Sequence, residues 1–348
     1  MKITSLIAGA VAHSSVAGEL GEVTIELPEE DPRFIMLRVA DDPSNMKRPA
    51  PGSLWSTKLL LGLAIVCAFA PRSPAAGPVV LKFKVGTSIV AQSSLNLDHP
   101  LLRNNPAVRL LVTHDFGSAA TGAFNDSALG VFYQANSAKS GDWFVTNENR
   151  TNLTATSSGG FNVMIAPAVR ASATAARADG GFTFLSVAKK KPEARLLITH
   201  MVNPFPATTP YGLYLPKNIG VRYFEGPLAK RTHDVWAVFN EDLSSAIAAA
   251  YNVLDVTAHP HSSIQTSSSG NTSGNHMALD DPVANNNPNA LIFVTHLGLD
   301  SPGSDTFDHA VGVFYDSTIS RWCIYREDNA TMPPNIAFVV DVFEAGSP

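Results

Sequence analysis

The sequence predicts an all-β protein of three tandem antiparallel units of about 90 residues, each resembling a β-sandwich or jelly roll. Three observations predict this fold. Short runs that alternate apolar and polar residues follow one another from Val79 onward. Stretches rich in Gly, Ser and Asn separate these runs, as turns separate strands. A set of short motifs also occurs three times in the same order, which indicates an internal repeat.

The motif set is clearest in the third copy. It begins with VTH at 294–296, continues with GVFY at 312–315 and WCIYRED at 322–328, and ends with AFVV at 337–340. The histidine lies 16, 20 and 16 residues before the glycine in the three copies, and the tryptophan always lies 5 residues before the glutamate. The framework residues of the repeats are His114, His200, His296, Trp143, Trp236, Trp322, Glu148, Glu241 and Glu327.

The expected domain boundaries follow from these repeats and from the N-terminal region. Repeats 1, 2 and 3 are expected at 77–167, 168–257 and 258–348. Residues 46–76 are expected to be a signal peptide, because Met46 opens a basic stretch, a core of 12 apolar residues (59–70) and a zone of small residues. The alternative for that core is a buried helix. Twelve apolar residues are too few to span a bilayer.

Residues 1–45 are expected to be an upstream artefact of gene calling. If they are real, VTIEL (23–27) and FIMLRVA (34–40) are expected to form a strand pair or a detachable strand.

The remaining elements are taken in chain order. VVLKFKV (79–85) alternates like a half-buried strand, and further strands are expected at RLLVTH, ALGVFYQ, DWFVTN and FNVMIA. EDLSSAIAAAYNV (241–253) has some helical character, for which one turn is expected. The lysines at 189–191 are expected in a solvated turn or at a protected edge. The polar run 259–275 is expected to be a surface loop or a weakly packed edge strand.

Composition limits the partners and the redox chemistry. The formal charge is −5 and only 16% of residues are charged, so no basic surface for nucleic acid is expected. No membrane span is expected in the mature chain. Cys67 would leave with the signal peptide, and Cys323 is expected to be an unpaired core thiol.

The repeated histidines and glutamates are candidate site residues. A zinc site needs at least three protein ligands, so one histidine per repeat favours a structural imidazole that bonds a loop backbone. A glycosidase needs two acids facing one cleft, so one glutamate per repeat favours a salt bridge or a turn hydrogen bond. His259 and His261 share a strand face, but no third ligand is evident near them. We therefore predict no catalytic residue, cofactor or metal.

Aromatic residues and glycan acceptors complete the candidates. The tryptophans are expected to pack in the core rather than to form an exposed face that stacks sugars. The long proline-rich loop of repeat 2, within 201–218, differs most between copies and is where specificity is expected. Candidate N-glycosylation sites are Asn125, Asn149, Asn152, Asn271 and Asn329.

The motifs VTH, GVFY or GVRY, WAVFNED and FNV resemble an uncharacterised tandem β-repeat domain family of secreted and cell-surface bacterial proteins. The likeness covers residues 80 to 343, with WFVTNEN in repeat 1 and YRED and FVV in repeat 3 as departures. The resemblance implies a surface or structural role without enzymatic activity.

The expected function is that of a secreted, non-enzymatic subunit that assembles with itself into an extracellular fibre or surface layer. Strand donation by residues 78–92 is one route. Glycans are further expected partners. A carbohydrate- or surface-binding adhesin that uses Tyr211 and Tyr214 is the alternative. A hydrolase with a His and Glu site between repeats is the third candidate.

Overall fold

The computed structural model describes residues 23–26, 36–39, 78–84, 93–117, 122–137, 140–153, 159–166, 169–172, 182–203, 214–225, 227–228, 231–232, 234–244, 249–299 and 306–344. Contacts divide the chain into two parts, residues 1–75 and residues 76–348, which are described separately. In the first part, β1 (Val23–Glu26) pairs antiparallel with β2 (Met36–Val39), as expected if this segment is real. The predicted signal peptide, residues 46–76, lies outside the described residues.

Every regular element described in residues 76–348 is a strand, which confirms the all-β prediction. Repeat 1 contains β3 (Val79–Lys84), β4 (Ser94–Asn96), β5 (Arg109–Asp115), β6 (Leu129–Ser137), β7 (Ser140–Asn147) and β8 (Gly160–Ala166). Repeat 2 contains β9 (Val169–Ser172), β10 (Phe182–Phe184), β11 (Leu196–Asn203), β12 (Ile219–Phe224), β13 (Pro227–Leu228), β14 (Arg231–Thr232), β15 (Val235–Asn240) and β16 (Ala250–Asp255). Repeat 3 contains β17 (Ser262–Thr266), β18 (Thr272–Ser273), β19 (His276–Ala278), β20 (Leu291–Leu297), β21 (Val311–Asp316), β22 (Arg321–Arg326) and β23 (Ala337–Phe343).

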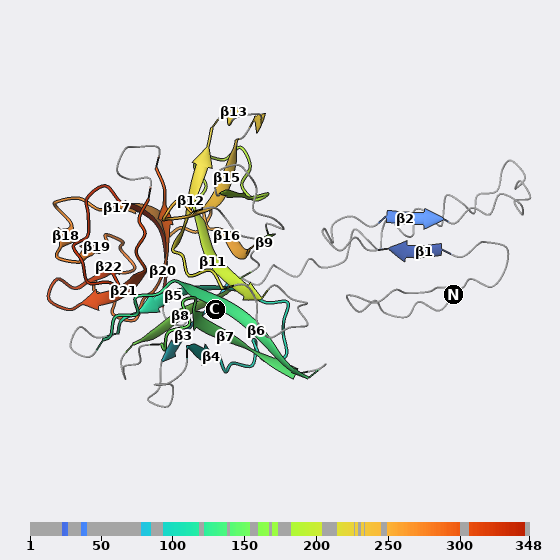
Figure 1. Ribbon diagram of the computed structural model, residues 1–348, viewed down its shortest axis with the longest axis horizontal. Coiled ribbons are helices and arrows are strands. Elements are labelled where there is room, and N and C mark those ends of the chain that lie inside the picture. Colours follow the sequence, from blue (N-terminus) through green and yellow to red (C-terminus); the bar gives the residue numbers. More distant parts are fainter. Residues whose placement is uncertain are drawn as a thin grey trace, which may run out of the picture. The chain divides into compact units, whose positions relative to one another are not determined.

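The repeats do not each build their own sheets; each large sheet is shared by two repeats (Figure 1). Sheet 1–2 has the order β4-β7-β6-β11-β16-β9, with three strands from repeat 1 and three from repeat 2. Sheet 2–3 has the order β10-β15-β12-β20-β23-β17, and sheet 3–1 the order β18-β19-β22-β21-β5-β8-β3. The three sheets therefore link the repeats in a closed cycle.

The joins between repeats are parallel, whereas the strand pairs within each repeat are antiparallel as predicted. At the joins, β11 pairs with β6, β20 with β12 and β5 with β21. In each join the histidine of one repeat lies opposite the glycine of the preceding repeat, in the pairs His200 and Gly130, His296 and Gly220, and His114 and Gly312. The spacing of the motifs thus reflects contacts between copies as well as within them.

The tryptophans anchor the cores and are almost completely buried, as expected from their apolar surface. Each lies directly across the sheet from the tyrosine of the GVxY motif, in the pairs Tyr133 and Trp143, Tyr223 and Trp236, and Tyr315 and Trp322. Each indole N–H donates to a backbone carbonyl, at Asn105 (2.8 Å), Lys191 (2.9 Å) and Asn287 (2.8 Å). A tyrosine and a tryptophan that are 7 to 13 residues apart in sequence therefore form one cross-strand pair in each repeat.

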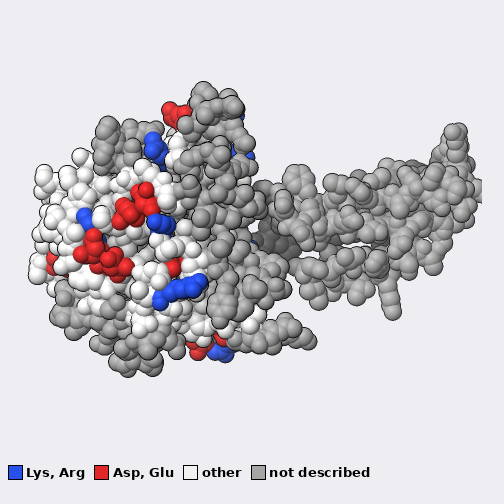
Figure 2. Space-filling model, in the orientation of Figure 1, with Lys and Arg blue, Asp and Glu red and all other residues white. Residues whose placement is uncertain are grey.

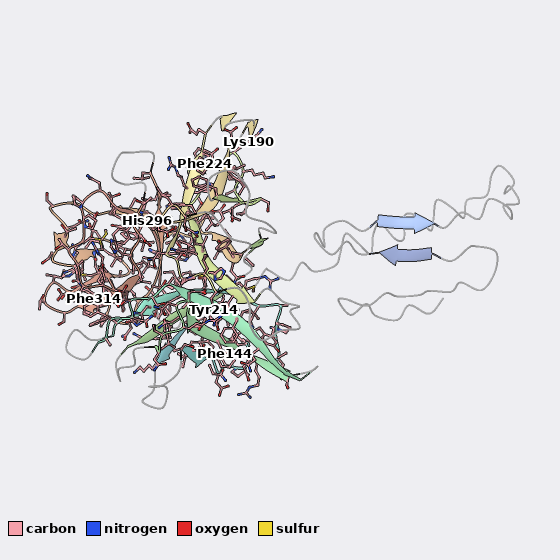
Figure 3. The ribbon with its side chains drawn as sticks, in the orientation of Figure 1. Phe144, Lys190, Tyr214, Phe224, His296 and Phe314 are labelled. Carbon is pink, nitrogen blue, oxygen red and sulfur yellow. The ribbon has the colours of Figure 1, made fainter. Side chains whose placement is uncertain are left out.

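Other predicted segments fall as follows. Described residues of the stretch 241–253 form a turn and β16 without a helix. The lysines at 189–191 lie in an exposed turn, labelled at Lys190 in Figure 3. Within the polar run 259–275, β17 is an edge strand, which was one of the two predicted alternatives. Cys323 is a buried free thiol. Among the described residues, no helix is long and apolar enough to cross a membrane.

Candidate functional site

The three VTH or ITH strands, β5, β11 and β20, meet at the centre of residues 76–348. Their threonines connect them in a ring, because each threonine Oγ1 accepts a backbone N–H from the strand of another repeat. Val112 donates to Thr199 (3.0 Å), Ile198 to Thr295 (3.0 Å) and Val294 to Thr113 (3.2 Å). One polar side chain per repeat thus closes the centre of the fold.

A second set of contacts crosses the same centre through the FNV motif. The Asn162 side chain donates to the Ile292 carbonyl (3.1 Å), and that of Asn252 donates to the Leu110 carbonyl (3.0 Å). Repeat 3 has Val339 at this position, so its FVV motif lacks the donor. The departure of repeat 3 from the motif therefore removes one of three equivalent links.

The repeated histidines and glutamates form three buried pairs between repeats. Each histidine Nδ1 bonds the Oε1 of the glutamate from the preceding repeat, and all six side chains are 1–4% exposed. The partner of the imidazole is thus a carboxylate rather than the expected loop backbone. The pairs are His114 and Glu327 (2.5 Å), His200 and Glu148 (2.5 Å), and His296 and Glu241.

The second oxygen of each glutamate holds a loop. Oε2 of Glu327 accepts the N–H of Asn125 (2.7 Å). The equivalent bonds run from Leu215 to Glu148 (2.9 Å) and from Phe307 to Glu241 (2.7 Å). Both oxygens of each carboxylate are therefore satisfied, which offsets much of the cost of burying it.

The repeated glycine makes room for this carboxylate. A Cβ on Gly220 would overlap Oε1 of Glu241 and approach the His296 ring, and a Cβ on Gly130 or Gly312 would overlap the corresponding glutamate. Glycine within a strand often marks such a close approach. The His, Gly and Glu motifs thus belong to one structural feature repeated three times.

The join between repeats 3 and 1 carries an additional hydroxyl. Tyr325 donates to Oε1 of Glu327 (2.8 Å) and lies 3.0 Å from Nδ1 of His114, at a position occupied by Thr146 and Phe239 in the other repeats. Burial opposes a charge on His114, but the attraction and hydrogen bond of Glu327, with Asp115, raise its pKa. Burial first, then Glu327, raises the pKa of Tyr325, which keeps the phenol protonated.

This join predicts a pH dependence of stability. A histidine whose pKa is raised by folding stabilises most below about pH 6.5, its unfolded pKa, and the contribution declines as pH rises through the folded pKa. The free energy of unfolding is therefore expected to fall above pH 6.5, as measured by urea denaturation from pH 6 to 9. His114→Gln should flatten this slope, whereas His99→Gln, in an exposed turn, should not. Equal slopes in all three proteins would contradict the assignment.

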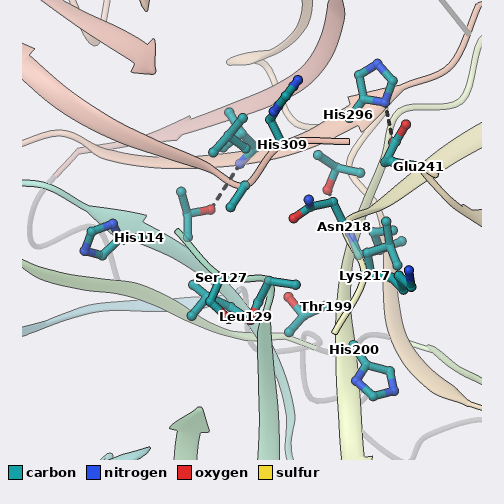
Figure 4. Close-up of a pocket in the computed structure, with 18 of the residues that line it drawn as sticks. His114, Ser127, Leu129, Thr199, His200, Lys217, Asn218, Glu241, His296 and His309 are labelled. Atoms are coloured by element: carbon teal, nitrogen blue, oxygen red, sulfur yellow. Dashed lines mark hydrogen bonds and ion pairs between the residues drawn. The ribbon is translucent and has the colours of Figure 1, made fainter. Parts of the chain in front are cut away.

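A cavity of about 100 Å³ opens where the three repeats meet (Figure 4). The three threonines and the apolar side chains beside them line it in equivalent positions. Two other lining positions differ between repeats 1, 2 and 3. The first is occupied by Ser127, Lys217 and His309 in that order, and the second by Ala128, Asn218 and Ala310. The described end of the loop 201–218, where specificity was expected, thus supplies Leu215, Lys217 and Asn218 to this cavity.

The charged groups near the cavity are paired. Lys217 bonds Asp242, the Asn218 amide donates to Asp308 (3.1 Å), and His309 lies 3.0 Å from Asp328. The Lys217 bond is among the causes that, against burial, lower the pKa of Asp242 to about 2. Figure 2 shows the same mixing of acidic and basic side chains on one face, with uncharged side chains over most of the described surface.

The HxH pair lies away from this cavity. His259 Nδ1 bonds Asp341 (2.5 Å) and its ring stacks on Phe343 with centroids 4.4 Å apart. Burial raises the pKa of Asp341 to about 6, against the opposing effect of His259. Within the described residues, no group of three or more His, Cys, Asp or Glu side chains is placed to hold a metal ion.

The glycan candidates differ in accessibility. Asn125 is buried, and its side-chain amide exchanges hydrogen bonds with that of Asn147 (2.8 and 2.9 Å). A glycan therefore cannot attach to Asn125 in this fold. The exposed or half-exposed candidates are Asn149, Asn152, Asn271 and Asn329.

Comparison with known proteins identifies a family but no characterised relative. A family model described as a domain of unknown function (DUF7452) matches residues 69–165 and 228–342, together more than half of the chain. The first stretch holds the motif set of repeat 1, and the second that of repeat 3. Comparisons with curated proteins and with solved structures give no match.

Proposed function

The chain belongs to the DUF7452 family, and we propose that it is a secreted, non-enzymatic structural protein that assembles with copies of itself into an extracellular fibre or surface layer. The first support is the use of its repeated polar residues. A catalytic acid or base must reach a substrate, whereas the His and Glu side chains of the three pairs are 1–4% exposed and bond each other. These residues serve the framework.

The observation that carries assembly is the sheet edge at β17, which is covered at its first residue, where the Arg195 guanidinium donates to the Ser262 carbonyl. β17 pairs with β23 on one side and has no strand on its other side among the described residues. Its sequence, SSIQT, lacks the Lys, Arg and Pro that usually protect edges, and Ile264 is 49% exposed. The edges at β4, β10 and β18 have only two or three residues, and the four-residue edge β9 contains an arginine, Arg170. β17 is therefore the edge best suited to pair with another copy.

The segment expected to donate a strand is placed within its own chain. β3, the described part of residues 78–92, pairs with β8 and carries Lys82 and Lys84 at the edge of sheet 3–1. Lys82 also pairs with the buried Asp115 (2.5 Å). Donation of β3 would require exchange between chains, so edge pairing through β17 is the simpler route to assembly.

The test replaces Ile264 with lysine. A charge at this edge disfavours strand pairing, so Ile264→Lys should abolish the filaments or layers of the wild type in electron micrographs and light scattering. Ile319→Lys is the matched control, because Ile319 is 48% exposed in the turn between β21 and β22. Wild-type protein that stays monomeric at high concentration would refute the proposal, as would equal assembly by both variants.

The binding and hydrolase candidates have less support. Tyr211 lies outside the described residues, and one face of Tyr214 is covered by the Arg150 guanidinium, 4.3 Å from the ring centroid. Stacking of a sugar on these tyrosines is thus less favoured than on an open ring. For the hydrolase, His and Glu do pair between repeats, but the pairs are buried. If the protein turned over any substrate and His296→Gln abolished that activity, the result would argue against a non-enzymatic role.

A further inference from the structure

We propose that the cavity at the meeting point of the three repeats binds one small, neutral, polyhydroxylated molecule, such as a single sugar ring. The inference goes beyond assembly, because it assigns a ligand site at the centre of the fold. Three features carry it: the threonine ring, the mixed polar and apolar lining, and the neutralised charges around it.

The threonine ring supplies three hydroxyl donors. Each hydroxyl oxygen already accepts one backbone N–H, yet no described residue accepts the hydroxyl protons of Thr113, Thr199 and Thr295. The threonines are each 4% exposed and line the cavity. A buried hydroxyl without an acceptor costs about 1–3 kcal/mol. The ring is thus suited to acceptor oxygens placed on the central axis.

The remaining lining matches a molecule with polar edges and an apolar face. Leu129, Ile219 and Val311 occupy equivalent positions around the cavity. Figure 4 shows the Asn218 side chain directed toward the space that the threonines line. Small-molecule sites combine a mainly apolar surface with a few placed hydrogen-bonding groups. A sugar ring has hydroxyls for the threonines and Asn218 and C–H groups for the aliphatic side chains.

The charges near the cavity argue against an anionic ligand. The cationic Lys217 is paired with Asp242, and Arg326 and His309 share the Asp328 carboxylate. Burial, then the charges of Asp328 and Glu327, raise the pKa of Asp126, against the opposing effect of His309 and Arg326. An oxyanion would meet these carboxylates without an unpaired cation, whereas a neutral molecule would not be repelled.

The lining also predicts the stoichiometry. The threonines are identical in the three repeats, but Ser127, Lys217 and His309 differ, and only repeat 2 supplies an asparagine beside them. A ligand on the axis therefore has one preferred orientation, and one molecule binds per chain. A cavity of about 100 Å³ holds one small molecule, since a water needs only about 10–15 Å³ in the same measure.

The experiment is isothermal titration of the full protein with a panel of monosaccharides and glycerol, with acetate and sulfate for comparison. At least one neutral member should bind with a stoichiometry of one and a Kd of about 1 mM or below. Thr199→Val should weaken binding at least tenfold, whereas Thr199→Ser, which keeps the hydroxyl, should not. Thr318→Val, in an exposed turn, is the matched control.

A second variant guards against a folding defect, because Thr199→Val also removes the acceptor of the Val112 N–H. Asn218→Ala leaves the threonine ring intact and should weaken binding at least fivefold with an unchanged urea midpoint. Three results would overturn the proposal. In the first, no neutral compound of the panel binds, and in the second, acetate or sulfate binds more tightly than every neutral compound. In the third, neither Thr199→Val nor Asn218→Ala changes the affinity. Ligand binding and assembly are tested independently, because a loss of assembly in Ile264→Lys would not change any of these binding results.

Discussion

Glu241→Ala is expected to lower the free energy of unfolding by about 3–5 kcal/mol, the usual cost of breaking a buried ion pair by removing one partner. The substitution leaves both Nδ1 of His296 and the N–H of Phe307 without their carboxylate. Urea denaturation of the purified protein measures the effect. Glu148→Ala should lose stability in the same range, and Glu327→Ala, which also leaves the Tyr325 hydroxyl without its acceptor, should lose at least as much.

Two further variants make this result specific. Glu241→Gln keeps an acceptor for the Phe307 N–H and should lose less, about 1–3 kcal/mol. Asp98→Ala removes an exposed carboxylate that pairs with Arg103, and should change stability by at most about 1 kcal/mol. If Glu241→Ala lowered the free energy of unfolding no more than Asp98→Ala does, the buried pairs would not hold the repeats together.

Gly220→Ala is expected to be comparably damaging, at about 3 kcal/mol or more, although it adds only one methyl group. Its Cβ would occupy the position of Oε1 of Glu241, so the carboxylate must move and lose its bonds to His296 and Phe307. Gly270→Ala is the matched control, because its Cβ would meet nothing closer than the Ser268 hydroxyl at 3.8 Å. Thermal denaturation of both variants measures the difference.

The double variant Gly220→Ala/Glu241→Ala tests the steric cause. With the carboxylate gone, the nearest neighbours of the new methyl group are His296 Nδ1 and Phe239 Cε1, both at 3.0 Å, so the double variant should be only slightly less stable than Glu241→Ala alone. Additive losses would mean that Gly220→Ala acts through the backbone rather than through Glu241. The test is specific to this join, because a Cβ on Gly130 would also meet Val202 at 2.7 Å and one on Gly312 would also meet the Tyr325 hydroxyl at 2.6 Å.

The strands and the cores were predictable because local physics determines them. Alternation of apolar and polar residues identified β3, and the motif spacing placed each tryptophan in a hairpin core. Both signals arise within about twenty residues of chain. They do not depend on how the repeats are arranged.

The joins between repeats were not predictable from the same signals. Motif spacing shows which positions of the repeats are equivalent. The spacing does not distinguish repeats that fold separately from repeats that share sheets, because it would be the same in both cases. His114 and Glu327 are 213 residues apart, and no local pattern selects Glu327 over Glu148 as the partner of His114. The repeated glycine was the available signal, since a glycine in a strand interior indicates a close approach of another group.

The candidate site was predictable in part. Divergence between copies pointed to the loop 201–218, whose described end supplies Lys217 and Asn218 to the cavity. The threonine ring was missed because a threonine within a β-strand is ordinary by propensity. Its role appears only when three strands from three repeats are placed around one axis.

Calorimetric unfolding tests whether the three repeats, which share their sheets, form one cooperative structure. A closed ring predicts a single transition for residues 76–348, with a calorimetric enthalpy equal to the van't Hoff enthalpy, and a shift of the whole transition in Glu148→Ala. Independent units would instead give separable transitions with about a third of the enthalpy each. In that case Glu148→Ala would shift only one of them, and the account of a closed ring would be contradicted.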